Sequence, residues 1–355
     1  MSILCRVLCA VVVVITTHCV PMPTPPNSPA VAIDSSGLFV VCEGLWRQDN
    51  AVLSFVDING MAMRDVVSAV TPDLRLGDTG SDIVAYGDTL AVCVSGSQSI
   101  ECFRRSTGAY IQRITLNSGE PYRMVLATNG VAYCTLISTD AIAKVDLVGG
   151  FVSVPNVPVG PAPEGIGLLN GRLYVANSGL GDLRKNEPGA GSVVVLDATE
   201  LLVLDTAVVL PNVMQCIADS ARQCMWFVYR HFVSQPDSLG GIVRYDVRTR
   251  TITDHIRVKQ PKSVLLSPVG GELYVLFLNG VDRYEPETRS RTPIVSHTSA
   301  NGNDVWYSLG WWHHKNAFVV GNARNYQTDG EIIVFTPTGN EILRAKVGLN
   351  PTAMR

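Results

Sequence analysis

A short apolar segment returns seven times along this chain, and the repetition limits the folds open to it. The copies lie roughly 40 to 50 residues apart, and each holds five mostly apolar residues. They begin at Leu38, Leu90, Val131, Leu173, Trp226, Leu273 and Ala317 and read LFVVC, LAVCV, VAYCT, LYVAN, WFVYR, LYVLF and AFVVG. A repeat of this period indicates units that are each covered by their neighbours.

A second segment of strand character follows each apolar segment after a polar loop. Its seven copies are VLSFVD, SIECFR, AIAKVD, SVVVLD, GIVRYD, GVDRYE and EIIVFT. A third strand then runs into a glycine or proline turn, as in VPVGPAPEG at residues 157–165. No segment keeps a helical spacing of apolar residues for three turns. Residues 198–210 come closest, but their valines favour a strand.

These patterns predict an all-β chain in which residues 30–355 form a seven-bladed β-propeller of four-stranded antiparallel blades. We expect the half-units left at the two ends, AVAIDSSG at residues 30–37 and NPTAMR at residues 350–355, to close the ring together. Hydrophobic residues make up 46% of the chain and charged residues 17%, which excludes a mainly disordered protein.

The N-terminus predicts export from the cytoplasm. Residues 1–19 read as a signal peptide, because Arg6 precedes a short apolar stretch, and residues 20–29 form a proline-rich tether. Cys19 stands where a bacterial lipoprotein would carry its lipid, although His18 replaces the small residue of that pattern; ordinary cleavage nearby is the alternative. We therefore expect an extracytoplasmic protein, either secreted or a lipoprotein of the outer membrane or cell surface, that meets the membrane only through such a lipid.

Six cysteines follow the export region. Cys93 and Cys102 flank one turn and Cys216 and Cys224 flank another, so each pair is a candidate disulfide across neighbouring strands. The alternative is that all six are small buried apolar residues. No C-x-x-C motif occurs, so the sequence gives no support for a zinc ribbon or a thioredoxin-type redox site.

The repeat resembles a known family of extracytoplasmic propellers. The YVAN strand at Tyr174, the aspartate that ends many second strands, and the VG-x-x-P turns at residues 159–163 and 347–351 are similar to the YVTN or YncE-like repeat. The order of GLFVVCEGLWRQDNAVLSFVD, GDTGSDIVAYGDTLAV, PAPEGIGLLNGRLYVANSG and DGEIIVFTPTGNEILRAKVGLNPT resembles a surface propeller-lipoprotein family of Bacteroidetes-type bacteria. Cys42 departs from this pattern, in which asparagine is usual, as does the blade around residues 102–108, which lacks the usual acidic residue.

The resemblance implies a non-enzymatic protein. Some members of the family resemble propellers that bind corrinoids and deliver them to an outer-membrane transporter. We accordingly expect capture of a small-molecule ligand at the cell surface, with such a transporter as a partner. Two alternatives stay open: a structural or adhesive surface protein that contacts proteins or polysaccharide, and a propeller hydrolase or lactonase.

Four long loops between the first and second segments hold most candidate binding residues. These loops span residues 43–50, 177–191, 230–241 and 321–330, and in a propeller they share a rim with the turns that join blades. Aromatic rings and arginine forks on one rim suit a large ligand that bears amides, phosphates or carboxylates. The candidates are Trp46, Arg47, Asp78, Tyr122, Arg123, Glu164, Asn177, Arg184, Arg230, Phe232, Trp306, Arg324 and Tyr326.

Composition and motifs argue against several other functions. The formal net charge of −3 is unsuited to a nucleic-acid binder that relies on bulk positive charge. No metal-ligand spacing, nucleophile elbow or phosphate-binding loop predicts a catalytic centre, a metal site or a cofactor. Asp57, Asp146, Asp197 and Asp246 recur at one point of separate units, which favours turn-forming hydrogen bonds over acid–base catalysis.

Overall fold

The computed structural model describes residues 31–235, 237–278, 280–297 and 304–355. Within the chain, Val31–Arg355 form one compact unit, which is described by itself below. The predicted signal peptide, the lipid-bearing Cys19 and the proline-rich tether lie outside the described residues.

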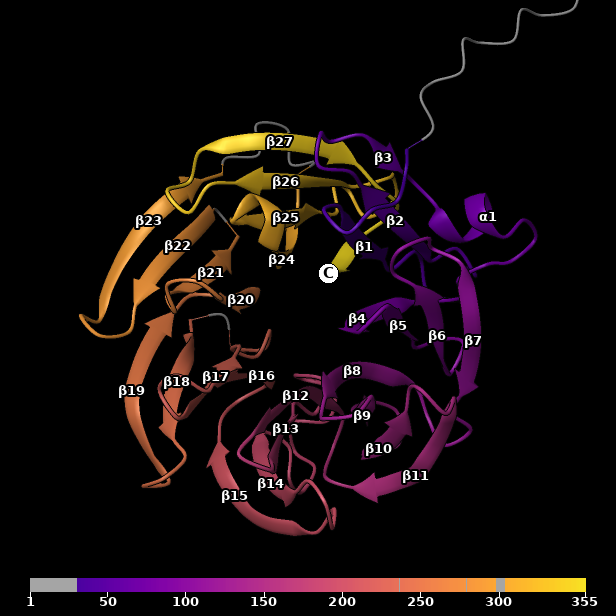
Figure 1. Ribbon diagram of the computed structural model, residues 1–355. Coiled ribbons are helices and arrows are strands. Elements are labelled where there is room, and N and C mark those ends of the chain that lie inside the picture. The colour runs from indigo at the N-terminus through magenta and orange to yellow at the C-terminus, as the bar shows by residue number, and fades with distance from the viewer. Residues whose placement is uncertain (1–30, 236, 279, 298–303) are drawn as a thin grey trace, which may run out of the picture. The chain divides into compact units, whose positions relative to one another are not determined.

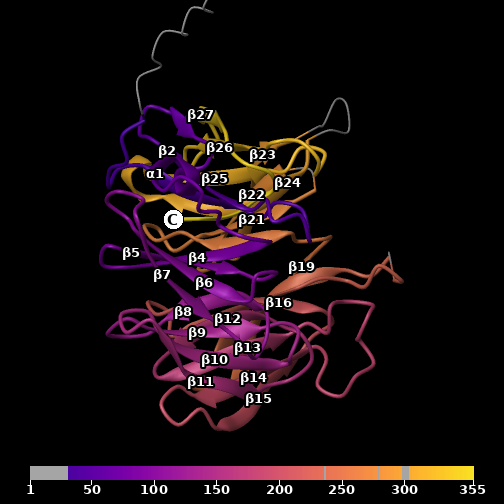
Figure 2. The ribbon, with the colours of Figure 1, turned by 90° about the vertical axis from the view of Figure 1, so that its right-hand side faces the viewer.

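Seven four-stranded antiparallel sheets form a ring around a central axis (Figure 1), which confirms the predicted all-β, seven-bladed propeller. In Figure 2 the same blades are seen from the side of the ring. From the innermost strand outward, the blades are β28 (Pro351–Met354), β1 (Leu38–Cys42), β2 (Val52–Val56) and β3 (Ala62–Met63); β4 (Gly80–Tyr86), β5 (Thr89–Val94), β6 (Ser99–Arg104) and β7 (Tyr110–Thr115); β8 (Pro121–Leu126), β9 (Val131–Leu136), β10 (Ala141–Asp146) and β11 (Phe151–Pro158); β12 (Pro163–Leu169), β13 (Arg172–Asn177), β14 (Ser192–Asp197) and β15 (Val203–Val209); β16 (Val213–Asp219), β17 (Cys224–Tyr229), β18 (Gly240–Asp246) and β19 (Thr251–Val258); β20 (Ser263–Leu266), β21 (Leu273–Phe277), β22 (Gly280–Glu285) and β23 (Ser290–Ser296); and β24 (Trp306–Trp312), β25 (Ala317–Asn322), β26 (Glu331–Phe335) and β27 (Glu341–Lys346). We number them blades 1 to 7 in this order.

The seven apolar segments of the repeat are the second strands of the blades. Strands β1, β5, β9, β13, β17, β21 and β25 are almost wholly buried, because both of their faces pack against neighbouring blades. One apolar cluster, for example, joins Ile100 of blade 2 to Ala132 and Val145 of blade 3. Such dry interfaces supply most of the hydrophobic stabilisation, since each fully buried large apolar side chain contributes about 1.5–3 kcal/mol. The outermost strand β15 confirms that residues 198–210 favour a strand.

Blade 1 closes the ring with strands from both ends of the unit. Val40 pairs with Met354 and Val41 with Ala353, so the C-terminal segment is the innermost strand, as predicted. The segment at residues 30–37 differs from the prediction, because its described residues form no strand. There the Asp34 carboxylate accepts hydrogen bonds from the backbone N–H groups of Ser36 and Gly37 and bends the chain into a turn.

Helix is confined to two short segments among the described residues. Helix α1 (Val66–Val70) lies in the connection from blade 1 to blade 2, and its N-cap Asp65 accepts hydrogen bonds from two backbone N–H groups. The 3₁₀ helix η1 (His313–Lys315) joins β24 to β25.

The two predicted disulfides are wrong, because all six described cysteines are free, buried thiols. Cys93 lies opposite Ile100, so Cys102 is a diagonal neighbour at about 7–8 Å, beyond the usual reach of a disulfide. Cys216 lies opposite Phe227, three residues from Cys224, so those two side chains point to opposite faces of the sheet. The alternative interpretation of buried apolar cysteines holds.

Candidate functional site

A cavity of about 680 Å³ runs along the axis of the ring. Its lining comes from the innermost strands of all seven blades, which surround the axis in Figure 1. The strands begin at the rim that also carries the loops between second and third strands. This rim is therefore the one on which the sequence predicted a binding face.

Nine polar and aromatic side chains gather where the innermost strands begin, and we call them the mouth cluster. Its members are Glu43, Asp82, Tyr122, Arg123, Glu164, Arg230, Lys262, Tyr307 and Tyr326. Because β-strand side chains alternate between faces, one residue near the start of each strand points toward the axis. Close packing of the strands is aided by Gly165, where a Cβ atom would lie 2.8 Å from the Cα of Gln215 on the next blade.

Glu43 and Tyr307 bring blades 1 and 7 together at the mouth. The Tyr307 hydroxyl donates a hydrogen bond of 2.8 Å to Oε2 of Glu43. Burial raises the pKa of the Glu43 carboxyl and that of the Tyr307 hydroxyl. Tyr326 packs edge-on against Tyr307, with ring centroids 5.9 Å apart. This side of the mouth offers phenol rings and a carboxyl group whose pKa is raised by burial.

Arg123 joins blade 3 to blade 2. Its guanidinium donates to the backbone carbonyl of Ser81, lies 3.9 Å from Oδ1 of Asp82, and stands 4.8 Å from the centroid of the Tyr122 ring. Asp82 in turn accepts a 2.8 Å hydrogen bond from the backbone N–H of Met124, while burial raises the pKa of its carboxyl. The guanidinium is thus fixed in place at the edge of the cavity.

Blades 4 to 6 supply one acid and two cations. Oε1 of Glu164 accepts a 2.6 Å hydrogen bond from the Ser178 hydroxyl, and burial raises the pKa of the Glu164 carboxyl. Arg230 donates from Nε to the carbonyl of Pro261 (3.0 Å) and from Nη2 to that of Lys262 (2.7 Å). Nζ of Lys262 donates to the carbonyl of Trp306 at 3.0 Å. Backbone oxygens, not carboxylates, hold these two cations.

Of the thirteen predicted residues, five belong to the mouth cluster: Tyr122, Arg123, Glu164, Arg230 and Tyr326. Others lie on the rim but hold loops in place. The Asp78 carboxylate accepts hydrogen bonds from the backbone N–H of Arg47 at 2.8 and 3.1 Å. The Arg47 guanidinium lies 4.1 Å from the centroid of the exposed Trp46 ring. This pair is free to meet solvent.

Arg184, Asn177 and Phe232 belong to the loops of blades 4 and 5. Arg184 makes ion pairs with Asp140 and Glu187, each with a shortest N–O distance of 2.6 Å. Asn177 is fully buried, and its Nδ2 donates to Val159 and Ser192. The Phe232 ring lies 5.1 Å from Nζ of Lys185, between the two loops. The contacts of Arg184 and Asn177 serve to fix the loop at residues 177–191.

Trp306 and Arg324 are engaged within blades 6 and 7. Trp306 is buried in an apolar cluster and stacks on His297, with centroids 4.4 Å apart. Arg324 pairs with Asp304 at 3.1 Å and with Glu331 at 3.4 Å.

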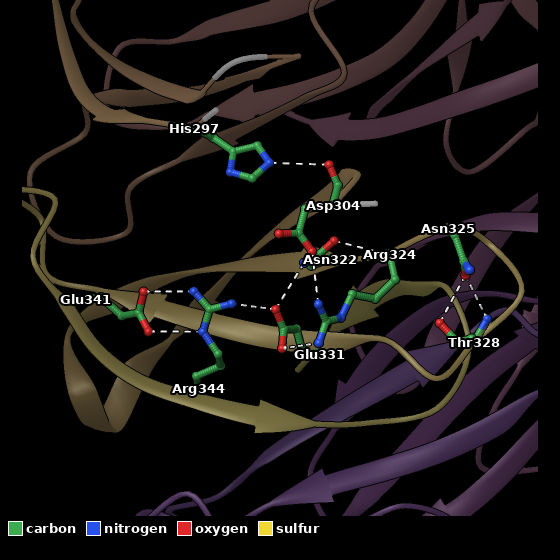
Figure 3. Close-up of polar contacts among 9 residues, drawn as sticks. All are labelled: His297, Asp304, Asn322, Arg324, Asn325, Thr328, Glu331, Glu341 and Arg344. Carbon is green, nitrogen blue, oxygen red and sulfur yellow. Dashed lines mark hydrogen bonds and ion pairs between the residues drawn. The ribbon is translucent and has the colours of Figure 1, made fainter. Parts of the chain in front are cut away.

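Arg324 is part of a charged network in blade 7, which is drawn in Figure 3. Glu331 has almost no exposed surface and receives Arg324 on one oxygen and Arg344 on the other, the latter at 2.5 Å. Arg344 also pairs with Glu341 at 3.0 Å, and Asn322 donates to both Asp304 and Glu331. Each arginine in this blade 7 network has at least one carboxylate partner.

Sequence reasoning missed four members of the mouth cluster: Glu43, Asp82, Lys262 and Tyr307. They lie at the ends of second strands or the beginnings of innermost strands, which are less apolar than the repeated segments. A signal was present, since each innermost strand begins just after a glycine or proline turn or a polar turn. A search for polar residues at that repeated position would have found Asp82, Lys262 and Tyr307.

The recurring aspartates form turns, as predicted. The carboxylates of Asp57, Asp146, Asp197 and Asp246 each accept hydrogen bonds from two backbone N–H groups that follow in the chain. The described residues contain no group of three or more His, Cys, Asp or Glu side chains placed to hold a metal ion. None of their helices has the length and apolar character needed to cross a bilayer.

No protein-family model matches the chain, and no curated protein matches it. Solved structures do: hydrazine synthase from Kuenenia stuttgartiensis aligns with a TM-score of 0.63 and 13% identity over 77% of this chain and 88% of that chain. A quinoprotein alcohol dehydrogenase-like protein from Bacteroides thetaiotaomicron aligns with a TM-score of 0.67 and 14% identity over 88% of this chain and 76% of that chain. A 6-phosphogluconolactonase-like protein from Bacteroides uniformis aligns with a TM-score of 0.63 and 10% identity over 90% of this chain and 98% of that chain. At these identities the similarity shows a shared β-propeller fold.

Proposed function

We propose that this chain is a non-enzymatic ligand-binding propeller that works outside the cytoplasm and holds its ligand at the mouth cluster. One observation carries the proposal: charged and phenolic side chains from all seven blades converge at the mouth of an axial cavity of about 680 Å³. That volume lies within the range of about 300–1,000 Å³ typical of small-molecule sites.

The chemistry of the mouth cluster favours a ligand rich in polar groups. Arg123, Arg230 and Lys262 offer donors, whereas Glu43 and Glu164 offer carboxyl groups with raised pKa values. Aromatic faces of Tyr122 and Tyr326 can cover an apolar part of the ligand. Amides, carboxylates and phosphates are the groups that such a set recognises, so corrinoids and siderophores are the first ligands to test.

The proposal extends to where the protein works and where its ligand goes. The resemblance to YncE-like surface propellers and the export signal predicted at residues 1–19 support a location at the bacterial surface. We infer that the bound ligand is passed to an outer-membrane transporter. The alternative role of a structural or adhesive surface protein needs no ligand in the axial cavity.

Calorimetry of the protein isolated from its native envelope tests the binding step. We expect at least one corrinoid or siderophore to give saturable heats, and Tyr122→Ala to weaken that binding because it removes the ring beside Arg123. Trp46→Ala is the matched control, since it removes a rim aromatic that lies outside the mouth cluster. Folded protein that gives no heat with any ligand in the panel contradicts the proposal.

Pull-down from native envelopes tests the transfer step. Recovery of an outer-membrane transporter supports delivery of the ligand. Recovery of surface-layer or matrix material instead, together with no heat of binding for any ligand in the panel, supports the adhesive alternative.

A further inference from the structure

Arg230 and Lys262 stand side by side at the mouth without a carboxylate partner. The Arg230 guanidinium bonds to the backbone carbonyl of Lys262, and both side chains are half-buried and line the cavity. Among the described residues, no Asp or Glu oxygen lies within 4.0 Å of either cationic group, in contrast to the ion-paired Arg184, Arg324 and Arg344. The residues outside the described ranges include no Asp or Glu at all, so none of them can be a missing counter-ion.

Two neighbouring cations in a partly dry site raise each other's free energy. Burial lowers the pKa of the Lys262 ammonium, and the charge of Arg230 lowers it further. Like charges held together without a counter-ion are costly, and the cost is relieved when an anion binds between them. The backbone carbonyls of Pro261, Lys262 and Trp306 hold both cations in position before any ligand arrives.

The remaining hydrogen-bond capacity indicates which anion fits. A guanidinium has five N–H donors, of which Arg230 uses two, and an ammonium has three, of which Lys262 uses one. Five donors remain for a ligand, one more than the roughly four lone-pair positions of a carboxylate. A phosphate monoester offers three oxygens and a charge of about −1.5 to −2, which matches the two positive charges.

We propose that Arg230 and Lys262 form a phosphate subsite within the mouth cluster. This inference rests on the proposed function, since it assigns the chemistry of one part of the same site. The phosphate can be free or part of a larger ligand. Glu164 opposes it from blade 4, because its carboxylate competes with the ligand for the positive field of Arg230.

The experiment is isothermal calorimetry on the full protein with inorganic phosphate, glycerol phosphate and acetate as probes. We expect both phosphates to bind more tightly than acetate. A preference for inorganic phosphate would assign the free ion as the source, and a preference for glycerol phosphate would assign a phosphate group within a larger ligand. Either preference supports the subsite, whereas equal binding of acetate and phosphate, or no binding of phosphate, overturns it.

Variants then test the two cations. Lys262→Met should weaken phosphate binding about 10- to 100-fold, because it removes charge-assisted hydrogen bonds. Arg47→Met is the control, since it removes the same charge from the same rim outside the mouth cluster and should change binding less than about 2-fold after screening by salt. Equal effects of both variants would mean that net charge alone attracts the anion, and would overturn the subsite.

Glu164→Gln supplies a gain-of-binding test that does not depend on removing a cation. We expect this variant to bind phosphate several-fold more tightly at a pH above the raised pKa of Glu164, because the negative charge of its carboxylate near Arg230 is lost. Unchanged or weaker binding in a folded Glu164→Gln protein contradicts the inference. If an organic ligand binds to Lys262→Met as tightly as to the unmodified protein, the phosphate subsite fails while the proposed function stands.

Discussion

The blade 7 network and the Arg230–Lys262 pair each bring two cationic side chains together, but they differ in charge balance. In blade 7, Arg324 and Arg344 share the buried carboxylate of Glu331. At the mouth, Arg230 and Lys262 have only backbone carbonyls as hydrogen-bond acceptors among the described residues. Ion pairing within the protein, more than residue type, therefore separates a structural cation from one that is available to a ligand.

The largest expected effect comes from breaking the blade 7 network. Glu331→Gln should lower the free energy of unfolding by about 2–4 kcal/mol, because Arg324 and Arg344 both lose the carboxylate between them. Urea denaturation measures the change. The control Glu341→Gln removes the exposed partner of Arg344 and should cost less than about 1 kcal/mol. Equal stability of Glu331→Gln and the unmodified protein would show that the blade 7 network does not stabilise the fold.

Lys262→Met, unlike Glu331→Gln, should not lower the free energy of unfolding. Without ligand, we expect its free energy of unfolding to be unchanged or slightly higher, since an unpaired, half-buried cation is lost. Phosphate at about 100 times its Kd should stabilise the unmodified protein by about 2.7 kcal/mol but should stabilise this variant far less. Thermal unfolding with and without phosphate reads both effects, and a strongly destabilised Lys262→Met protein would show that the lysine is structural after all.

The pH dependence of stability should separate the two kinds of acid. Burial raises the pKa of Glu164 above its ordinary value of 4.5, so its contribution to stability is full below that pH and is lost as the pH rises through the raised pKa. Arg184 lowers the pKa of Asp140 below its ordinary value of 3.8, so that contribution is present above pH 3.8 and is lost as the pH falls.

Two variants measure these slopes by urea denaturation from about pH 3 to pH 8. Glu164→Gln should make the decline of stability above pH 4.5 shallower, and Asp140→Asn should flatten the acid side of the curve. The same slope in both variants and the unmodified protein would count against the assigned directions.

The smallest effect is expected at the exposed rim. Trp46 is 66% exposed and touches the Arg47 guanidinium, so Trp46→Ala should change the free energy of unfolding by less than about 0.5 kcal/mol. Its affinity for phosphate should also stay the same. A large decrease in stability or in phosphate affinity would show that the binding site extends beyond the mouth cluster.

The fold could be predicted because its strongest signal lies in the most buried strands. Segments such as LYVAN are apolar along their whole length, since both faces of a second strand meet a neighbouring blade. The end of the chain was also assigned correctly, whereas residues 30–37 look like half a blade but turn at Asp34. The polar hydrogen bond that bends the chain there carries no periodic signal.

The site could be predicted only in part. Tyr122, Arg123, Glu164 and Arg230 stood out by residue type and by their place in rim loops or turns. Arg184 and Arg324 look the same in sequence, yet Asp140 and Glu331 neutralise them across the fold. Those partners lie 44 and 7 residues away, and no local pattern reveals that they meet. The cysteine pairs failed for a related reason, because strand register decides which residues face each other.

Ring closure by β28 has a consequence for when the mouth comes into being. Glu43 lies just after the first strand of the unit and Tyr307 in blade 7, and their hydrogen bond spans 264 residues. Residues 351–354 dock beside β1, and direct contacts such as the Arg64–Asp329 ion pair also hold blade 7 against blade 1. During synthesis on the ribosome, therefore, the mouth cluster is complete only once Tyr307 and Tyr326 of blade 7 have emerged, and we expect a product that stops before blade 7 to fail in binding the ligand.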